Sequence, residues 1–159
     1  MTEQAKRRRP YMRNYGIATD ETGLIAWEWV DEQMTKARNY WIGSTRPDGR
    51  PHAAPVWGVW YEGALYFGSD PGSRKARNFA QQPEIVVHLE SGDETVILEG
   101  KIEQTTDPAR IAPVDQLYAA KYPPFDPTPS QFYFVLRPHT AFAWHERNFP
   151  ESATRWDFD

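Results

Sequence analysis

Most of this chain consists of short segments in which apolar and polar residues alternate, and each segment ends at a turn signal. The segments occupy residues 39–46, 51–63, 64–70, 84–91, 94–105 and 131–146. A period of two is the repeat of a β-strand with one buried face. The connections include Pro-Asp-Gly at 47–49 and Glu-Gly at 62–63, which favour tight turns. Because the strands do not alternate with helices, the pattern argues against a Rossmann-type sheet. It predicts an antiparallel barrel or α+β domain of about six strands.

Three further segments have helical periodicity or helix-start signals. Residues 24–38 place Trp27, Val30, Met34 and Ala37 on one stripe, residues 73–81 follow a Pro-Gly turn, and residues 108–121 follow a cap at Thr106 or Asp107. The segment YPPFDPTPS at 122–130 is too rich in proline for regular structure, and we expect an ordered loop. Residues 1–18 are basic, and we expect a flexible N-terminal arm ahead of a single domain at 19–159.

Composition narrows the class of protein. The 159 residues include 40% hydrophobic and 25% charged side chains, the balance of a folded domain. The net charge of −4 gives no support for general nucleic-acid binding, and the chain has no cysteine. No apolar run approaches the ~20 residues of a membrane span, so we expect a cytoplasmic protein that binds neither nucleic acid nor membrane. Aromatic residues reach 14%, which suits a filled core, an interface or a pocket for a flat ligand.

The stretch FGSDPGSRKARNF, residues 67–79, is the strongest chemical signal. It predicts a strand, a Pro-Gly turn and a helix from Ser73 whose first turn carries Arg74 and Lys75. Cations at a helix N-terminus are unfavourable by about 0.3–1 kcal/mol each. Free backbone N–H groups, a hydroxyl, a guanidinium and an ammonium together suit a phosphate monoester. A surface turn with its cations in water explains the residues equally well on chemistry alone.

Other chemistries lack their residue patterns. The spacing in GSDPGSRK does not match a P-loop, because Gly72 is followed by Ser-Arg-Lys. The four histidines show no metal-ligand spacing, and no GxSxG elbow is present.

The run ALYFGSDPGSRKARNFAQQPEIVVHLES, with RPHAAPVW before it and EGK after it, resembles the pyridoxamine 5′-phosphate oxidase-like family of FMN-binding split barrels and the related deazaflavin reductases. The resemblance covers roughly residues 39–103, with a weaker match in the tail. It implies a six-stranded antiparallel split β-barrel with peripheral helices, which forms a homodimer with flavin sites between the subunits. It also implies the residues that bind FMN, or alternatively the deazaflavin F420: Ala54, Pro55, Val56, Trp57, Ser69, Ser73, Arg74, Lys75, Trp144 and Arg155. Gly58 is expected to leave room for the flavin ring.

The sequence departs from true vitamin B6 oxidases. Where those enzymes carry further tail residues and a glutamine that hold their substrate, this chain has Trp156, Asp157, Phe158 and Thr95. We therefore expect a flavin-dependent oxidoreductase that transfers hydride to or from a small organic substrate, with no side chain identified as catalytic. Trp57, Trp144 and Trp156 are the candidate pocket aromatics, while Tyr118, Lys121 and Tyr122 carry low weight. A deazaflavin reductase, a non-catalytic flavin- or haem-binding module and a purely structural dimer remain alternatives.

Overall fold

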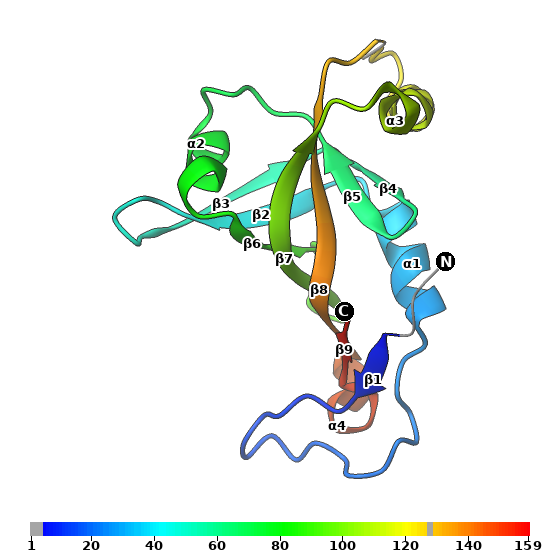
Figure 1. Cartoon of the computed structure of the whole chain (residues 1–159). Coiled ribbons are helices and arrows are strands. Elements are labelled where there is room, and N and C mark those ends of the chain that lie inside the picture. The colour runs from blue at the N-terminus through cyan, green and yellow to red at the C-terminus, as the bar shows by residue number, and fades with distance from the viewer. Residues whose placement is uncertain (1–4, 127–128) are drawn as a thin grey trace.

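The computed structural model describes residues 5–126 and 129–159, and antiparallel strands make up most of it (Figure 1). The strands are β1 Lys6–Arg8, β2 Tyr40–Thr45, β3 Pro51–Val56, β4 Val59–Tyr61, β5 Ala64–Phe67, β6 Glu84–His88, β7 Glu94–Thr105, β8 Tyr133–His145 and β9 Thr154–Asp157. The helices are α1 Trp27–Lys36, α2 Arg74–Gln81, α3 Pro108–Lys121 and α4 Phe149–Ser152, with the 3-10 helix Glu146–Asn148 between β8 and α4.

The strand order explains why the barrel is split. Strands β3, β2, β6, β7 and β8 pair in that sequence, and β8 also pairs through Phe134–Leu136 with β5, which pairs with β4. The expected strand at 51–63 is two strands, because the chain changes partner at Trp57-Gly58. Before this point β3 pairs with β2, and after it β4 pairs with β5. The hydrogen-bonded sheet therefore does not close, although the chain itself runs around the ring. The predicted mainly β, antiparallel split-barrel fold is confirmed.

Strands β7 and β8 form the longest ladder of the sheet. Its register shifts between Glu99 and Gly100, which makes a β-bulge. A Cβ at Gly100 would lie 2.7 Å from the carbonyl oxygen of Arg137. Glycine in the EGK segment thus permits the close approach of the two strands at the bulge.

Two groups of buried residues make up the core. The larger fills the barrel beneath α1 and α2 and includes Val30, Met34, Tyr40, Leu65 and Phe67. The smaller lies under α3, where Ile111, Val114 and Tyr118 pack on the outer side of β4, β5 and β8. Figure 1 shows α2 and α3 near the same end of the barrel and α4 near the opposite end. Among the described residues, no helix is long and apolar enough to cross a bilayer.

The N-terminal segment contacts the domain through residues 6–9. Strand β1 pairs with β9, and neither strand was expected from the sequence. The Arg9 guanidinium donates hydrogen bonds to four carbonyl oxygens, those of Asp20, Thr22, Glu151 and Ala153. The first four residues of the predicted arm, and residues 127–128 of the predicted loop, lie outside the described residues. The division of the chain into an arm and a domain stays a prediction.

Candidate anion-binding site

The turn between β5 and α2 has the form predicted from the sequence. An Asp70 carboxylate oxygen accepts a hydrogen bond from the Gly72 N–H at 2.6 Å, and the Asp70 carbonyl accepts one from the Ser73 N–H. Ser73 has extended backbone angles and caps α2, since its Oγ accepts from the Ala76 N–H at 3.2 Å. Ser69 lies beside it, with the two hydroxyl oxygens 3.0 Å apart. The structure thus brings the two predicted serines together at the start of α2.

Arg74 and Lys75 begin α2 and are both partly buried. An Arg74 Nη1 lies 3.5 Å from the Asn78 Oδ1, one turn further along the helix. Neither Arg74 nor Lys75 forms a salt bridge with any residue in the described parts of the chain. The first turn of α2 therefore holds two cations that no carboxylate neutralises.

Asn78 fixes the helix on the sheet and was not predicted. It is fully buried, and its Nδ2 donates to the Oγ of buried Ser44 on β2 at 3.0 Å. The signal was present in the sequence, because an amide on the apolar face of a short helix, next to Phe79, needs a buried partner. This bond holds the middle of α2 against the end of β2.

Two more basic side chains belong to the same surface. His52 on β3 lies opposite Ser44 in the register, and Arg46 follows β2. Burial lowers the pKa of His52, and the positive charges of Arg46, Lys75 and Arg74 lower it further. The cationic cluster, by which we mean Arg46, His52, Arg74 and Lys75, therefore draws on three elements. The sequence pattern indicated only Arg74 and Lys75 of these four residues.

The predicted flavin strand, Ala54 to Trp57, is at the edge of the sheet. β3 pairs only with β2, and Pro51, Ala53 and Pro55 are exposed on one of its faces. Prolines suit an edge strand because they remove donors from the ladder. Ala54 and Val56 alternate with them and are partly buried. The exposed face leaves room for a flat ligand or a second chain.

Trp57 ends this strand on an aromatic stack. Its ring lies parallel to that of Tyr122, with centroids 4.5 Å apart, and the Arg38 guanidinium is 5.3 Å from the Trp57 centroid. The indole is 39% exposed, so part of it stays accessible.

The expectation for Gly58 was wrong, because the protein itself fills the space beside this residue. Gly58 is buried, and a Cβ there would lie 2.9 Å from Leu65 Cδ1 and 3.2 Å from Tyr40 Cδ2. Its N–H donates to the Tyr122 hydroxyl, and its carbonyl accepts from the Lys121 ammonium at 2.9 Å. Tyr122 and Lys121 thus hydrogen-bond the backbone of Gly58, where the chain passes from β3 to β4.

The two predicted tail residues lie apart from α2 within one chain. Trp144 packs edge-on against Phe149 of α4, and Arg155 forms a 2.8 Å salt bridge with Asp157. β9, which carries Arg155, and α4, against which Trp144 packs, lie at the end of the barrel opposite α2 (Figure 1). One chain alone does not bring Trp144 or Arg155 to the cationic cluster.

Trp156 is a core residue, so the expectation that it borders the pocket was wrong. Only 1% of its surface is exposed, and it meets Trp27 edge-on with centroids 5.3 Å apart. Its period-two position on β9 points the indole into the barrel.

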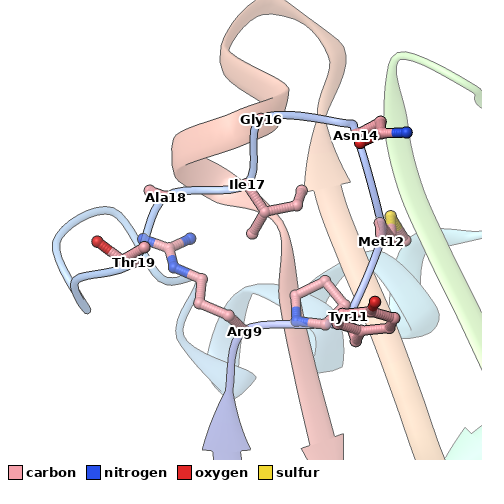
Figure 2. A pocket seen from close by; sticks show the side chains of 9 residues that line it. Arg9, Tyr11, Met12, Asn14, Gly16, Ile17, Ala18 and Thr19 are labelled. Carbon is pink, nitrogen blue, oxygen red and sulfur yellow. The ribbon is translucent and has the colours of Figure 1, made fainter.

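A separate hollow of about 510 Å³ lies in the N-terminal loop and is lined by residues between 9 and 19. Ile17 points into the space that the loop encloses, and Arg9 lies at its base (Figure 2). None of the predicted flavin-binding residues lines this hollow.

The fold and the cationic cluster together define a split-barrel domain with a basic surface at the start of α2, and comparison with known proteins gives its family. The family model described as pyridoxamine 5′-phosphate oxidase matches residues 26–145. The chain therefore belongs to the pyridoxamine 5′-phosphate oxidase family. A comparison with curated proteins found no significant match.

Solved structures share the fold at low sequence identity. A conserved hypothetical protein of Mycobacterium tuberculosis has a TM-score of 0.69 and 20% identity, over 86% of this chain and 91% of that one. An F420 reductase structure has a TM-score of 0.53 and 22% identity, over 69% of this chain and 94% of that one. A pyridoxamine 5′-phosphate oxidase-related FMN-binding protein of Nostoc punctiforme has a TM-score of 0.55 and 21% identity, over 79% of this chain and 82% of that one.

Proposed function

We propose that this protein is a flavin-dependent oxidoreductase that binds FMN between the two subunits of a homodimer and transfers hydride to or from a small organic substrate. The observation that carries the proposal is the cationic cluster, which faces no carboxylate within salt-bridge distance in the described residues. Gathered positive charge at a helix N-terminus is costly unless an anion binds there. Membership of the family supports a flavin as the source of that anion.

The residues present fit a flavin phosphate. Arg74 offers a planar fork, Lys75 a compact ammonium, and the capped first turn of α2 free backbone N–H groups. Asn78 holds the helix in register through Ser44. The edge backbone of β3, from Ala54 to Trp57, would lie along the ring, and the free part of Trp57 would border it. When bound, flavin supplies hydride chemistry at its ring, while these residues bind, orient and shield it.

The single chain also supports a role for a second copy. β9, which carries Arg155, and α4, against which Trp144 packs, lie at the far end of the barrel from α2, which supports the assignment of these two side chains to the flavin of the partner subunit (Figure 1). The exposed edge of β3 is the surface on which we place that partner.

The proposal does not extend to vitamin B6 oxidation. The positions that would hold that substrate are occupied in other ways. Trp156 is in the core, Asp157 accepts hydrogen bonds from Arg8 and Arg155, and buried Thr95 donates to the Gly92 carbonyl. We therefore propose a different substrate.

The absorption spectrum of the purified protein, with mass spectrometry of the acid-released cofactor, tests the proposal. FMN in equal amount to the protein, reducible by a nicotinamide cofactor or dithionite and reoxidised by an organic acceptor, is the expected result. If the released cofactor is F420, the proposed cofactor changes from FMN to the deazaflavin. The F420 reductase of similar fold supports this alternative. If the flavin binds but is never reduced and reoxidised, the protein is a non-catalytic flavin-binding module. Failure to bind either cofactor after reconstitution would refute the proposal.

A further inference from the structure

His52 has a buried nitrogen without a partner. Its Nδ1 is the single buried side-chain nitrogen or oxygen that lacks a hydrogen bond in the described parts of the chain, although the ring as a whole is partly exposed. Buried polar atoms are nearly always paired, and an orphan is costly unless something else binds it. β2, the strand that pairs with β3, offers no hydrogen-bond partner to His52 Nδ1. We therefore look for the partner outside the sheet.

The neighbours of His52 point to the charge of that partner. The positive charges that act on His52 are those of Arg46, which follows β2, and of Lys75 and Arg74 at the start of α2. No acidic side chain is among the groups that influence His52. Ser44 lies opposite His52 in the register and is already bonded to Asn78. A ring among three cations is best satisfied by an anion that all four side chains share.

We propose that His52 is a further ligand of the flavin's terminal phosphoryl group and takes up a proton when that group binds. The inference rests on the proposed function, because it assumes that a phosphorylated flavin occupies the cationic cluster. In the free protein, burial and the three cations keep the imidazole neutral near neutral pH. A bound phosphate monoester brings a charge near −2 and reverses the repulsion, so the imidazolium becomes favourable.

Binding and protonation are then linked. A ring that gains a proton on binding makes the flavin bind more tightly as the pH falls toward the range where the free ring titrates, by up to about tenfold per pH unit. A phosphate diester carries a single negative charge and gains less from the extra proton. His52 would therefore favour a terminal monoester, as in FMN, over a diester-linked cofactor.

The test compares FMN affinity of the wild-type protein and His52→Gln by flavin fluorescence between about pH 6.5 and 8.5, where the phosphate remains mostly dianionic. Glutamine keeps a neutral hydrogen-bonding group and removes the titration. We expect wild-type affinity to increase several-fold as the pH falls, and His52→Gln to bind FMN weakly and with little pH dependence. Riboflavin, which lacks the phosphate, should show no pH dependence with either protein.

The matched control is His139→Gln. His139 is exposed and paired with Glu84, so its loss should leave the wild-type pH profile unchanged. Imidazole NMR resonances assigned by their loss in His52→Gln should titrate at higher pH with FMN than without it. Equal pH slopes for wild type and His52→Gln, or an unshifted His52 titration, would overturn the role of His52 while FMN binding itself stands. Absence of FMN binding by the wild-type protein at every pH would overturn both proposals.

Discussion

The amide nitrogen of Asn78 donates a 3.0 Å hydrogen bond to the hydroxyl of Ser44, and both side chains are buried. This bond joins α2 to β2 at the point where the cationic cluster forms. Because α2 has only eight residues, its position depends on few contacts. The bond thus links the stability of the helix to the geometry of the proposed phosphate site.

Replacing Asn78 by alanine should affect both stability and binding. It leaves the Ser44 hydroxyl and the Arg74 guanidinium without a partner, and we expect a loss of about 1–3 kcal/mol in the free energy of unfolding, measured with urea. FMN affinity should also fall, although Asn78 is not placed against the phosphate. Asn148→Ala is the control, since Asn148 is exposed and caps no helix with its side chain. A stability loss no greater than the control's would contradict the anchoring role.

Replacing Arg74 and Lys75 together by alanine should abolish FMN retention. Each charge-assisted hydrogen bond contributes about 1.5–3 kcal/mol, so we expect at least about a hundredfold loss in affinity. The fold should be unaffected, because removing unneutralised cations from a first turn costs the helix nothing. Arg13→Ala combined with Lys36→Ala removes the same charge from exposed positions elsewhere. Equilibrium dialysis compares the two variants, and equal affinities would refute the site.

The helix cap at Ser73 has a matched counterpart at Asp107. Ser73 accepts from the Ala76 N–H, and Asp107 accepts from the Ala109 N–H at the start of α3. Loss of either cap should lower the free energy of unfolding by about 0.5–2 kcal/mol. Only Ser73→Ala should also weaken FMN binding. If Asp107→Ala weakened it equally, the effect would reflect global stability and Ser73 would have no place at the phosphate.

A shared site predicts complementation between two defective variants. Arg74→Ala/Lys75→Ala lacks the phosphate side chains, and Arg155→Ala lacks the tail residue that we assign to the partner. Random mixing of the two chains, by unfolding and refolding together, gives half heterodimers with one intact site each, so about a quarter of all sites should bind FMN. Flavin content after gel filtration measures the fraction. A mixture that binds no more than its separate components would show that each chain forms its own site, or none.

Lys121 should make stability depend on alkaline pH. Burial, together with a smaller contribution from the charge of nearby Arg38, lowers the pKa of Lys121 to about 8. The unfolded chain keeps the ordinary higher value, so between these values it binds more protons than the folded state. The free energy of unfolding of the wild type, measured relative to that of Lys121→Met, should therefore rise by about 1–2 kcal/mol from pH 8 to 10. This figure is smaller than the full pKa shift would give, because the ammonium is partly solvated. The neutral amine still has the two donors that it gives to Tyr40 and Gly58. Exposed Lys36→Met should show no such trend in urea unfolding.

Local patterns predicted much of this protein. The period-two segments correspond to β2 through β8, the three helices occur within a few residues of their predicted bounds, and Ser73 caps α2 as its position suggested. These features depend on near neighbours along the chain, which the sequence displays directly. The short strands β1 and β9 were missed because each has too few residues to show a period, and each is stabilised by the other.

The amino-acid sequence alone determined the antiparallel fold and the position of Arg74 and Lys75 at the start of a helix. Alternating apolar and polar residues, turn residues and helix caps act on near neighbours in the chain. The tertiary structure decided which distant groups act together with them: the charges of Arg46, Arg74 and Lys75 all act on His52 because β2 and β3 pair in one register and Asn78 holds the helix there. It also decided that Trp156 fills the core and that Gly58 accommodates Tyr40 and Leu65. Burial and charge proximity depend on the packing of segments far apart in the chain, and no local pattern records them.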